Sequence, residues 1–205
     1  MAQQLRQLAL PIEESLLRAI RSFNCLGSRH AADPVAENVN AFLVDGRFLA
    51  GLEQGISSTY LLLDEELDPP LLGYATLTFD SVRLTNAEKR QMQDLLGIGE
   101  FGALRIQMIG IDHHHQGKGF GTALLEVITG LARKLSNDVA LRFLLADANV
   151  RKVGWYAAHG FIGNRAAQER GRTDPQRSVS MRLDLLEALS DPESEDRALL
   201  VAALE

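Results

Sequence analysis

A cluster of glycines between an apolar segment and an amphipathic one constrains the fold of this chain more than any other feature. Gly117, Gly119 and Gly121 follow LRIQMIGID (residues 104–112), which has the apolar composition of a strand. From Thr122 to Leu135 the apolar residues recur at helical spacing, and VALRFLLA (139–146) predicts a buried strand. The centre of the chain is therefore predicted to be a strand, a glycine turn, a helix and a second strand.

Further elements are predicted on both sides of this unit. Together they indicate an α/β fold in which a central mixed sheet is flanked by helices. Strands are predicted over 58–66 and 71–84, which form an antiparallel hairpin that opens the sheet. Further strands are predicted from Phe161 onward and over 178–185. Helices are predicted over 13–23, from the Asp33 cap to Gly46, from the Thr85–Glu88 capping box to Gly97, and over 150–159, while 47–55 stays unassigned.

Length and composition indicate one ordinary domain. With 205 residues, 46% hydrophobic and 23% charged, the chain can bury a core without disulfides, and its one cysteine, Cys25, predicts none. We expect a single domain over 1–205, with an N-terminal helical extension (about 1–30) and an acidic C-terminal tail (about 186–205). No apolar run reaches the roughly 20 residues that cross a bilayer. We therefore expect a cytoplasmic protein with no membrane association.

The net charge of −6 is confined to the C-terminal end. From Asp184 onward there are seven acidic residues and a single basic one, Arg197, so the rest of the chain is neutral. A neutral body gives no composition-level reason to expect a nucleic-acid partner, although it does not exclude one.

The glycine turn has the features of an anion-binding site. Glycines let the backbone bend tightly and approach a ligand, and a helix start directs free N–H groups and the positive end of its dipole at an anion. A phosphate or pyrophosphate is the natural ligand, although a strand-to-helix turn without a ligand has the same pattern. A P-loop is excluded because Gly119 stands where a magnesium-binding Ser or Thr is needed, and no acidic residue has the offset of a dinucleotide-binding fold.

Two motifs resemble those of one family. Gln116-Gly117-Lys118-Gly119-Phe120-Gly121 resembles the Q/R-x-x-G-x-G/A acetyl-CoA signature of the GNAT superfamily of N-acetyltransferases. Asn149, Tyr156, Gly160 and Phe161 resemble its second motif, although Lys152 stands at the usual Ala and Trp155 precedes the Tyr. The resemblance covers about residues 58–185. It implies the GNAT acyl-CoA N-acyltransferase fold, acetyl-CoA as co-substrate and no metal.

The resemblance also implies roles for individual residues. Backbone amides between Gly117 and Thr122 would hold the pyrophosphate of CoA, and the strand over 109–111 would pair with the pantetheine amides and splay from the strand at 139–146. Gly110 suits either such an approach or simple packing. Asn149 suits a cap of the following helix, a contact with the pantetheine, or both. Tyr156 would protonate the leaving thiolate. The implied acetyl-CoA-binding residues are Ile109, Gly110, Ile111, Gln116, Gly117, Lys118, Gly119, Phe120, Gly121, Thr122 and Asn149.

The residues around these motifs leave the general base open. The strand over 104–112 carries no Glu or internal His, so Asp112 and Asp147 are the remaining candidates. The lack of a strong base favours an α-amine acceptor, with a pKa near about 8, over a lysine near about 10.4.

Other reactive side chains are given structural interpretations. The histidines at 113–115 are expected to point in different directions without an acidic partner at ligand spacing, so we predict no metal site. Trp155 is predicted to be core. Cys25 is predicted to be a partly buried residue and not a nucleophile.

A narrower resemblance lies upstream. The segments FNC (23–25), VNAFL (39–43), GISSTYLLLD (55–64) and LLGYATLTFDSVRL (71–84) resemble toxin-type acetyltransferases of toxin–antitoxin pairs, which acetylate the α-amine of aminoacyl-tRNA. An insertion after Cys25, Met108 in place of Arg and the neutral body depart from that group. The implied partners are aminoacyl-tRNA and an antitoxin or a second copy of the chain. Two alternatives stay open: acetylation of a small amine or a protein N-terminus, and a non-catalytic acetyl-CoA-binding module.

Overall fold

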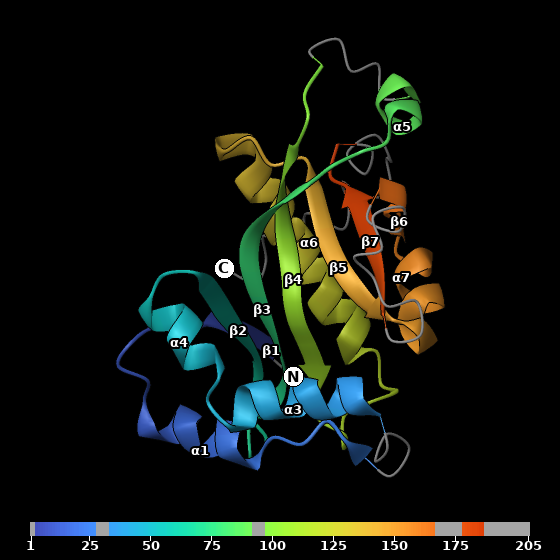
Figure 1. The fold of residues 1–205 in the computed structure, drawn as a ribbon. Coiled ribbons are helices and arrows are strands. Elements are labelled where there is room, and N and C mark those ends of the chain that lie inside the picture. The colour runs from blue at the N-terminus through green and yellow to red at the C-terminus, as the bar shows by residue number, and fades with distance from the viewer. Residues whose placement is uncertain (1–2, 28–32, 92–96, 167–177, 187–205) are drawn as a thin grey trace. The chain divides into compact units, whose positions relative to one another are not determined.

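The computed structural model describes residues 3–27, 33–91, 97–166 and 178–186. These form a mixed α/β fold whose seven strands are hydrogen-bonded in the order β1-β2-β3-β4-β5-β7-β6, which confirms the predicted fold class. The strands are β1 (Gln3–Gln7), β2 (Ser57–Asp64), β3 (Leu71–Val82), β4 (Phe101–Ile111), β5 (Phe143–Asn149), β6 (Ile162–Gly163) and β7 (Ser178–Asp184) (Figure 1).

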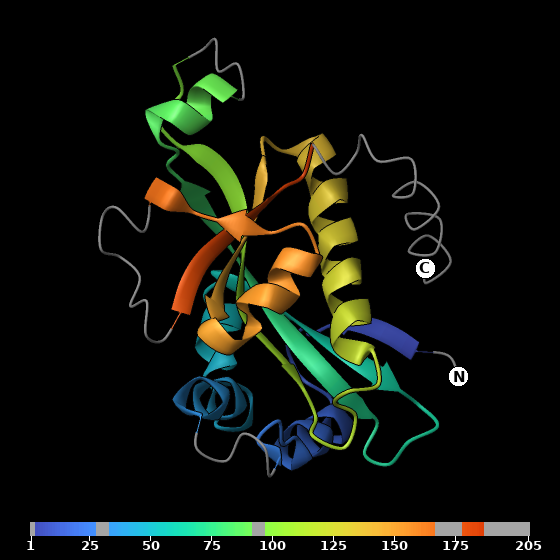
Figure 2. The same cartoon turned by 90° about the vertical axis from the view of Figure 1, so that its right-hand side faces the viewer.

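The helices lie between these strands along the chain, several of them in succession before β2. They are α1 (Glu14–Ser22), α3 (Pro34–Val44), α4 (Phe48–Glu53), α5 (Asn86–Gln91), α6 (Phe120–Asp138), the 3₁₀ turn η1 (Val150–Lys152) and α7 (Val153–Ala158) (Figure 2). Within the described ranges, none of the helices has the length and apolarity needed to cross a membrane. Residues 187–205 of the predicted acidic C-terminal tail lie outside the described residues.

The described residues group into two compact units. The first contains residues up to 78 together with 107–128, and the second contains 79–106 and the residues from 129 onward. In the first unit, β1 pairs with β2 and β2 pairs with β3, both antiparallel. Its core joins α1 and α3 to this part of the sheet: Phe23 packs edge-to-face on Tyr74, with ring centroids 5.4 Å apart, and the Tyr74 hydroxyl donates to the Val39 carbonyl.

Strand β1 and helix α4 were not expected. β1 lies in the segment predicted to be a helical extension, so it, and not the hairpin, opens the sheet. The sequence QQLRQ has no strand signal of its own, and its partner β2 lies some fifty residues away in the chain. α4 contacts β2, where a Cβ at Gly51 would lie 2.2 Å from Ser57 Oγ. Glycine therefore permits this contact instead of breaking the helix.

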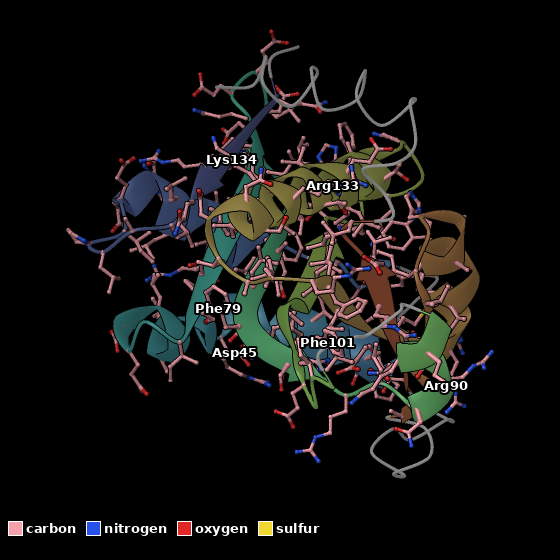
Figure 3. The ribbon with its side chains drawn as sticks, turned by 90° about the horizontal axis from the view of Figure 1, so that it is seen from above. Asp45, Phe79, Arg90, Phe101, Arg133 and Lys134 are labelled. Carbon is pink, nitrogen blue, oxygen red and sulfur yellow. The ribbon has the colours of Figure 1, made fainter. Side chains whose placement is uncertain are left out.

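In the second unit, β4 and β5 are parallel, while β5 pairs with β7 and β7 with β6 in antiparallel register. Phe101, labelled in Figure 3, packs edge-to-face on Phe143 at 5.9 Å in a small apolar cluster. β5 begins at Phe143 and not at 139. The Arg142 amide donates to the Gly102 carbonyl, and a Cβ at Gly102 would lie 2.2 Å from the Ala140 oxygen. Residues 139–142 therefore form a connection that crosses closely over the start of β4.

The predicted capping box is confirmed and extends into a buried ion pair. One Glu88 oxygen accepts from the amide and the hydroxyl of Thr85, each at 2.8 Å. The other accepts from Arg182 of β7 at 2.6 Å, and both side chains are buried. Burial alone would raise the pKa of Glu88, but the hydrogen bonds from Thr85 and Arg182 outweigh it and lower the pKa. The pair therefore fastens α5 to the sheet.

We expect Glu88→Gln to destabilise the protein by about 3 kcal/mol at neutral pH, because it leaves the Arg182 charge buried without a partner. The folded-state pKa of Glu88 is lowered, so its contribution is fully present above the unfolded pKa of about 4.3 and disappears as pH falls through the folded value. Urea unfolding of both proteins at several pH values checks this. The difference in unfolding free energy should shrink at acidic pH, and a pH-independent difference would contradict it.

Candidate functional site

The glycine turn between β4 and α6 is open and lined by backbone donors. Gly117 and Gly119 have φ of 76° and 90°, values that favour glycine, and a Cβ at either would meet nothing within 4 Å. α6 begins at Phe120, so the amides of its first turn have no carbonyl four residues earlier within the helix. The Gly119 carbonyl already accepts from Ala123 at 3.0 Å. The turn therefore has the glycine conformations and the helix start that an anion site requires, and anion binding there stays a prediction.

Asp112 anchors the beginning of this turn. Its buried carboxylate accepts from the amide of Asn24 at 2.9 Å and from the amide of His114 at 3.0 Å, and its own amide donates to the Leu72 carbonyl at 2.8 Å. Each oxygen thus accepts a backbone N–H group, and these hydrogen bonds are stronger to the carboxylate than to a protonated carboxyl group. This geometry makes Asp112 a structural anchor, so it is unsuited to be the general base.

Gln116 anchors the same turn from the other side. Its Nε2 donates to the carbonyls of Cys25 and Ile111, each at 2.9 Å. The Cys25 amide in turn donates to Asn40, and burial raises the pKa of the Cys25 thiol to about 11. Gln116 therefore positions the turn through protein carbonyls, while its contact with a ligand stays a prediction. Cys25 is buried and stays a neutral thiol at physiological pH, in line with its predicted structural role.

The histidines after Asp112 are arranged differently from the expectation. The rings of His113 and His114 lie 3.7 Å apart, and their ligand atoms and those of Asp112 all lie within 4.8 Å of one another. Their side chains therefore do not diverge, and an acidic group is close. However, Asp112 already accepts two amides and His113 Nδ1 lies 2.9 Å from the Asn24 carbonyl, so these atoms have protein partners. His115 packs edge-to-face on Phe120 of α6.

The pairing of β4 with β5 is short. It extends from Ala103–Phe143 to Ile106–Ala146, although β4 continues to Ile111 and β5 to Asn149. Within the described residues, no register between the two strands extends beyond this point, and the splaying of β4 from β5 stays a prediction. Ile109 and Ile111 lie in this part of β4 and are half-buried.

Gly110 is a packing accommodation. A Cβ at this position would lie 2.9 Å from Val39 Cγ1 and 3.1 Å from Tyr74 Cε1, inside the core of the first unit. The sequence left a close ligand approach and a packing role equally open for this glycine. The direction of the missing Cβ favours packing, whereas Gly117 and Gly119 face open space.

Tyr156 of α7 is buried between aromatic rings but keeps an unbonded hydroxyl. It packs on Trp155 at 4.8 Å and on Phe161 at 5.2 Å. Burial, and secondarily the charge of Asp147, raise the pKa of this phenol, so it stays protonated at neutral pH. Its hydroxyl has no hydrogen-bond partner among the described residues, which is unusual for a buried tyrosine and suits a donor that faces a ligand. Trp155 is half-exposed, so its prediction as core is wrong.

Polar residues occupy the end of β5 that precedes Tyr156. Asn149 accepts from the Arg151 amide at 2.9 Å and caps η1, which confirms the predicted capping role and leaves its ligand contact as a prediction. Asp147 is half-exposed and pairs with Arg105 of β4 at 2.6 Å. Sequence reasoning missed Arg105, although a single charge in an otherwise apolar strand was the signal that could have found it.

Comparisons with known proteins agree on the fold. Residues 42–161 match the model of the acetyltransferase (GNAT) family. A search of curated proteins finds no significant match. Similar solved structures include a bacterial toxin, with 20% identity, 91% of this chain and 94% of that chain covered and a TM-score of 0.68. Another is AtaT complexed with acetyl-methionyl-tRNAfMet, with 18% identity, 87% and 93% coverage and a TM-score of 0.62.

A third similar structure is a tyrosine-to-phenylalanine mutant of the toxin AtaT bound to the C-terminus of the antitoxin AtaR and to acetyl-CoA. It has 18% identity, 88% of this chain and 92% of that chain are covered, and the TM-score is 0.60. At identities this low, the three structures establish a shared fold and do not by themselves establish a shared substrate.

We expect Gly110→Ala to lower the free energy of unfolding by about 1–3 kcal/mol with no ligand present, because the new methyl group overpacks the core against Val39 and Tyr74. Gly99→Ala is the control, since a Cβ there meets nothing within 4 Å. Denaturant unfolding of the two variants checks this. A Gly110→Ala protein as stable as the control would return this glycine to a ligand-binding role.

Proposed function

This chain belongs to the acetyltransferase (GNAT) family, and from that premise we propose that it transfers the acetyl group of acetyl-CoA directly to the α-amine of an aminoacyl-tRNA. Family membership makes it an N-acetyltransferase, so the acceptor is the part that is proposed. The open glycine turn at the start of α6 is the observation that carries the donor half, and the complex of AtaT with an acetylated aminoacyl-tRNA suggests the acceptor.

Acetyl-CoA is proposed to bind along the end of β4 and the turn that follows. The amides from Gly117 to Thr122 would take the pyrophosphate, with Lys118 and Phe120 at the same turn. The pantetheine would add to β4 over Ile109–Ile111, past the last residue that pairs with β5. Asn149, at the end of β5, is the further proposed pantetheine contact. These residues fit the ligand because the turn offers free donors and room for phosphate oxygens.

Tyr156 is proposed to assist departure of the thiolate. The neutral amine attacks the thioester carbonyl, a C–N bond forms and the C–S bond breaks. Since burial raises the pKa of Tyr156, the phenol is present in its protonated form throughout the neutral range. Complete proton transfer to a thiolate with a pKa near about 8.5 is then uphill. The main contribution of Tyr156 is therefore a hydrogen bond to the developing sulfur charge.

The acceptor is proposed to be an α-amine because the site offers no strong base. Asp112 is used by backbone amides, so the amine must lose its proton to solvent or a weak acceptor. An α-ammonium with a pKa near about 8 does this readily at neutral pH, unlike a lysine near about 10.4. By analogy with the AtaT–AtaR complex, an antitoxin is the proposed protein partner.

A small amine or a protein N-terminus is the second candidate acceptor. The neutral body favours it, because polyanionic tRNA is usually bound through an excess of basic residues.

The first test separates these acceptors. Purified protein is incubated with acetyl-CoA labelled in the acetyl group and an extract containing charged tRNA, and RNA, protein and small molecules are then separated. We expect label in RNA that mild alkali releases together with the amino acid. Label only in protein or small molecules would replace the proposed acceptor. Label in no fraction would favour a non-catalytic acetyl-CoA-binding module.

We expect Tyr156→Phe to lower kcat by about a hundred-fold, while the Kd for acetyl-CoA changes by less than about two-fold, because only the hydroxyl is removed. Tyr60→Phe, at a half-buried tyrosine of β2, is the matched control and should keep full activity. Steady-state kinetics and calorimetric titration measure both quantities. An active Tyr156→Phe enzyme would remove the hydroxyl from the mechanism.

A further inference from the structure

Resting on the proposed function, we propose that Asp147 binds the ammonium group of the acceptor beside Tyr156, and that Arg105 and Asp80 hold its carboxylate in place. Asp147 is thereby a specificity-determining residue for a cationic amine. Arg105 and Asp80 are positioning residues that act through it.

The three side chains form a continuous ion-pair chain across three strands. Arg105 Nη1 lies 2.6 Å from Asp147 Oδ2, and Arg105 Nε donates to Asp80 Oδ2. Burial alone would lower the pKa of Arg105, but the charges and hydrogen bonds of the two carboxylates outweigh it and raise it. The guanidinium is therefore permanently cationic. Two carboxylates on one guanidinium leave the cluster with one unit of negative charge.

Strand register explains why this charge is presented at the surface. Leu145 is the Cα partner of Arg105, and Asp147 follows Leu145 by two residues, so these side chains share one face of the sheet. Leu145 belongs to the apolar cluster that includes Val82 and Phe143. The central Arg105 is the least exposed of the three, at 23%, and the carboxylates at the two ends are more exposed, at 35% for Asp80 and 51% for Asp147. The ion-pair chain therefore borders the core and ends in an accessible carboxylate.

Asp147 also lies where a substrate is expected. Ala146 is the last residue of β5 that pairs with β4, and Asp147 follows it directly. β5 then leads through Asn149 into η1 and α7, and α7 contacts β5. Burial, and secondarily the charge of Asp147, raises the pKa of the Tyr156 phenol. Within the described part of the chain, Asp147 Oδ1 has no hydrogen-bond partner. A cation placed on this oxygen would neutralise the excess charge next to the proposed acid.

The chemistry balances with Asp147 as a binding group. The bound ammonium releases one proton to solvent, and the resulting amine forms the C–N bond as the C–S bond breaks. The nitrogen then loses a second proton, while the sulfur ends with one proton, so the products are the acetamide, CoA thiol and one proton in solvent. Asp147 gains and loses no proton. Its carboxylate attracts the cation and keeps it near the site as it deprotonates.

The test compares charged tRNA with the same tRNA pool after its α-amines have been converted to hydroxyls. Both are titrated at equilibrium against protein loaded with CoA, so no turnover interferes. For the wild type, we expect the Kd of the hydroxyl form to be roughly ten-fold higher, the size of one charge-assisted hydrogen bond at a half-exposed site. Asp147→Asn should remove this difference, and Asp147→Glu, which keeps the charge, should retain most of it.

Glu100→Gln is the matched control. Glu100 is also a half-exposed carboxylate that pairs with an arginine, Arg83, but it lies before the first residue of β4. This variant should discriminate like the wild type. Thermal unfolding verifies that all variants are folded, and their affinity for acetyl-CoA should equal that of the wild type. A purely structural ion pair would alter stability without altering the ratio of the Kd values for the amine and hydroxyl forms.

The outcomes distinguish the two levels of the proposal. If the wild type binds neither the amine nor the hydroxyl form of the charged tRNA, the proposed acceptor is wrong and the role of Asp147 falls with it. If it binds both forms equally, only the recognition of the amine by Asp147 is wrong. If the wild type prefers the amine and Asp147→Asn keeps that preference, only the role of Asp147 is wrong. The same conclusion follows if Asp147→Glu behaves like Asp147→Asn, since the charge would then not be what recognises the amine.

Discussion

The buried carboxylate of Asp112 is the interaction on which the proposed donor site depends. It stands at the end of β4, binds the backbone of Asn24 and of His114, and its own amide binds Leu72 of β3. A charged group in the interior is tolerated only when hydrogen bonds replace its hydration, and these amides supply them. One side chain therefore fixes where the strand stops, where the N-terminal segment crosses and where the glycine turn begins.

Local signals in the sequence predicted the parts of this arrangement that local physics determines. The glycine spacing, the Thr85–Glu88 capping box and the Asn149 cap each concern residues within a few positions of one another, and all three were found as predicted. The alternation of strand, turn, helix and strand follows in the same way from periodicity. These signals were sufficient for the fold class and for the position of the glycine turn.

The remaining features depend on partners that are distant in the chain. β1 has an undistinguished sequence and is a strand because β2 offers it an edge. The stacking of His113 on His114 follows from the anchors at Asn24 and Asp112, which adjacent positions in a turn do not reveal. The partners of Arg105 come from β3 and β5, so its isolated charge could mark the residue but could not identify the two carboxylates that it binds. Residue propensities and motif spacing carry no information about which distant segments of the chain pair with each other.

Tyr156 combines two requirements that oppose each other. Burial and the charge of Asp147 keep the phenol protonated, which preserves a donor for the hydrogen bond proposed to the leaving thiolate, but the same raised pKa weakens the phenol as an acid. A cationic acceptor beside Asp147 would offset the carboxylate charge and thereby lower the pKa of the phenol only while the amine is bound. The acidity of Tyr156 would then rise when the acceptor binds. The single carboxylate of Asp147 would thus select an ammonium group and keep Tyr156 a weak acid while no acceptor is bound.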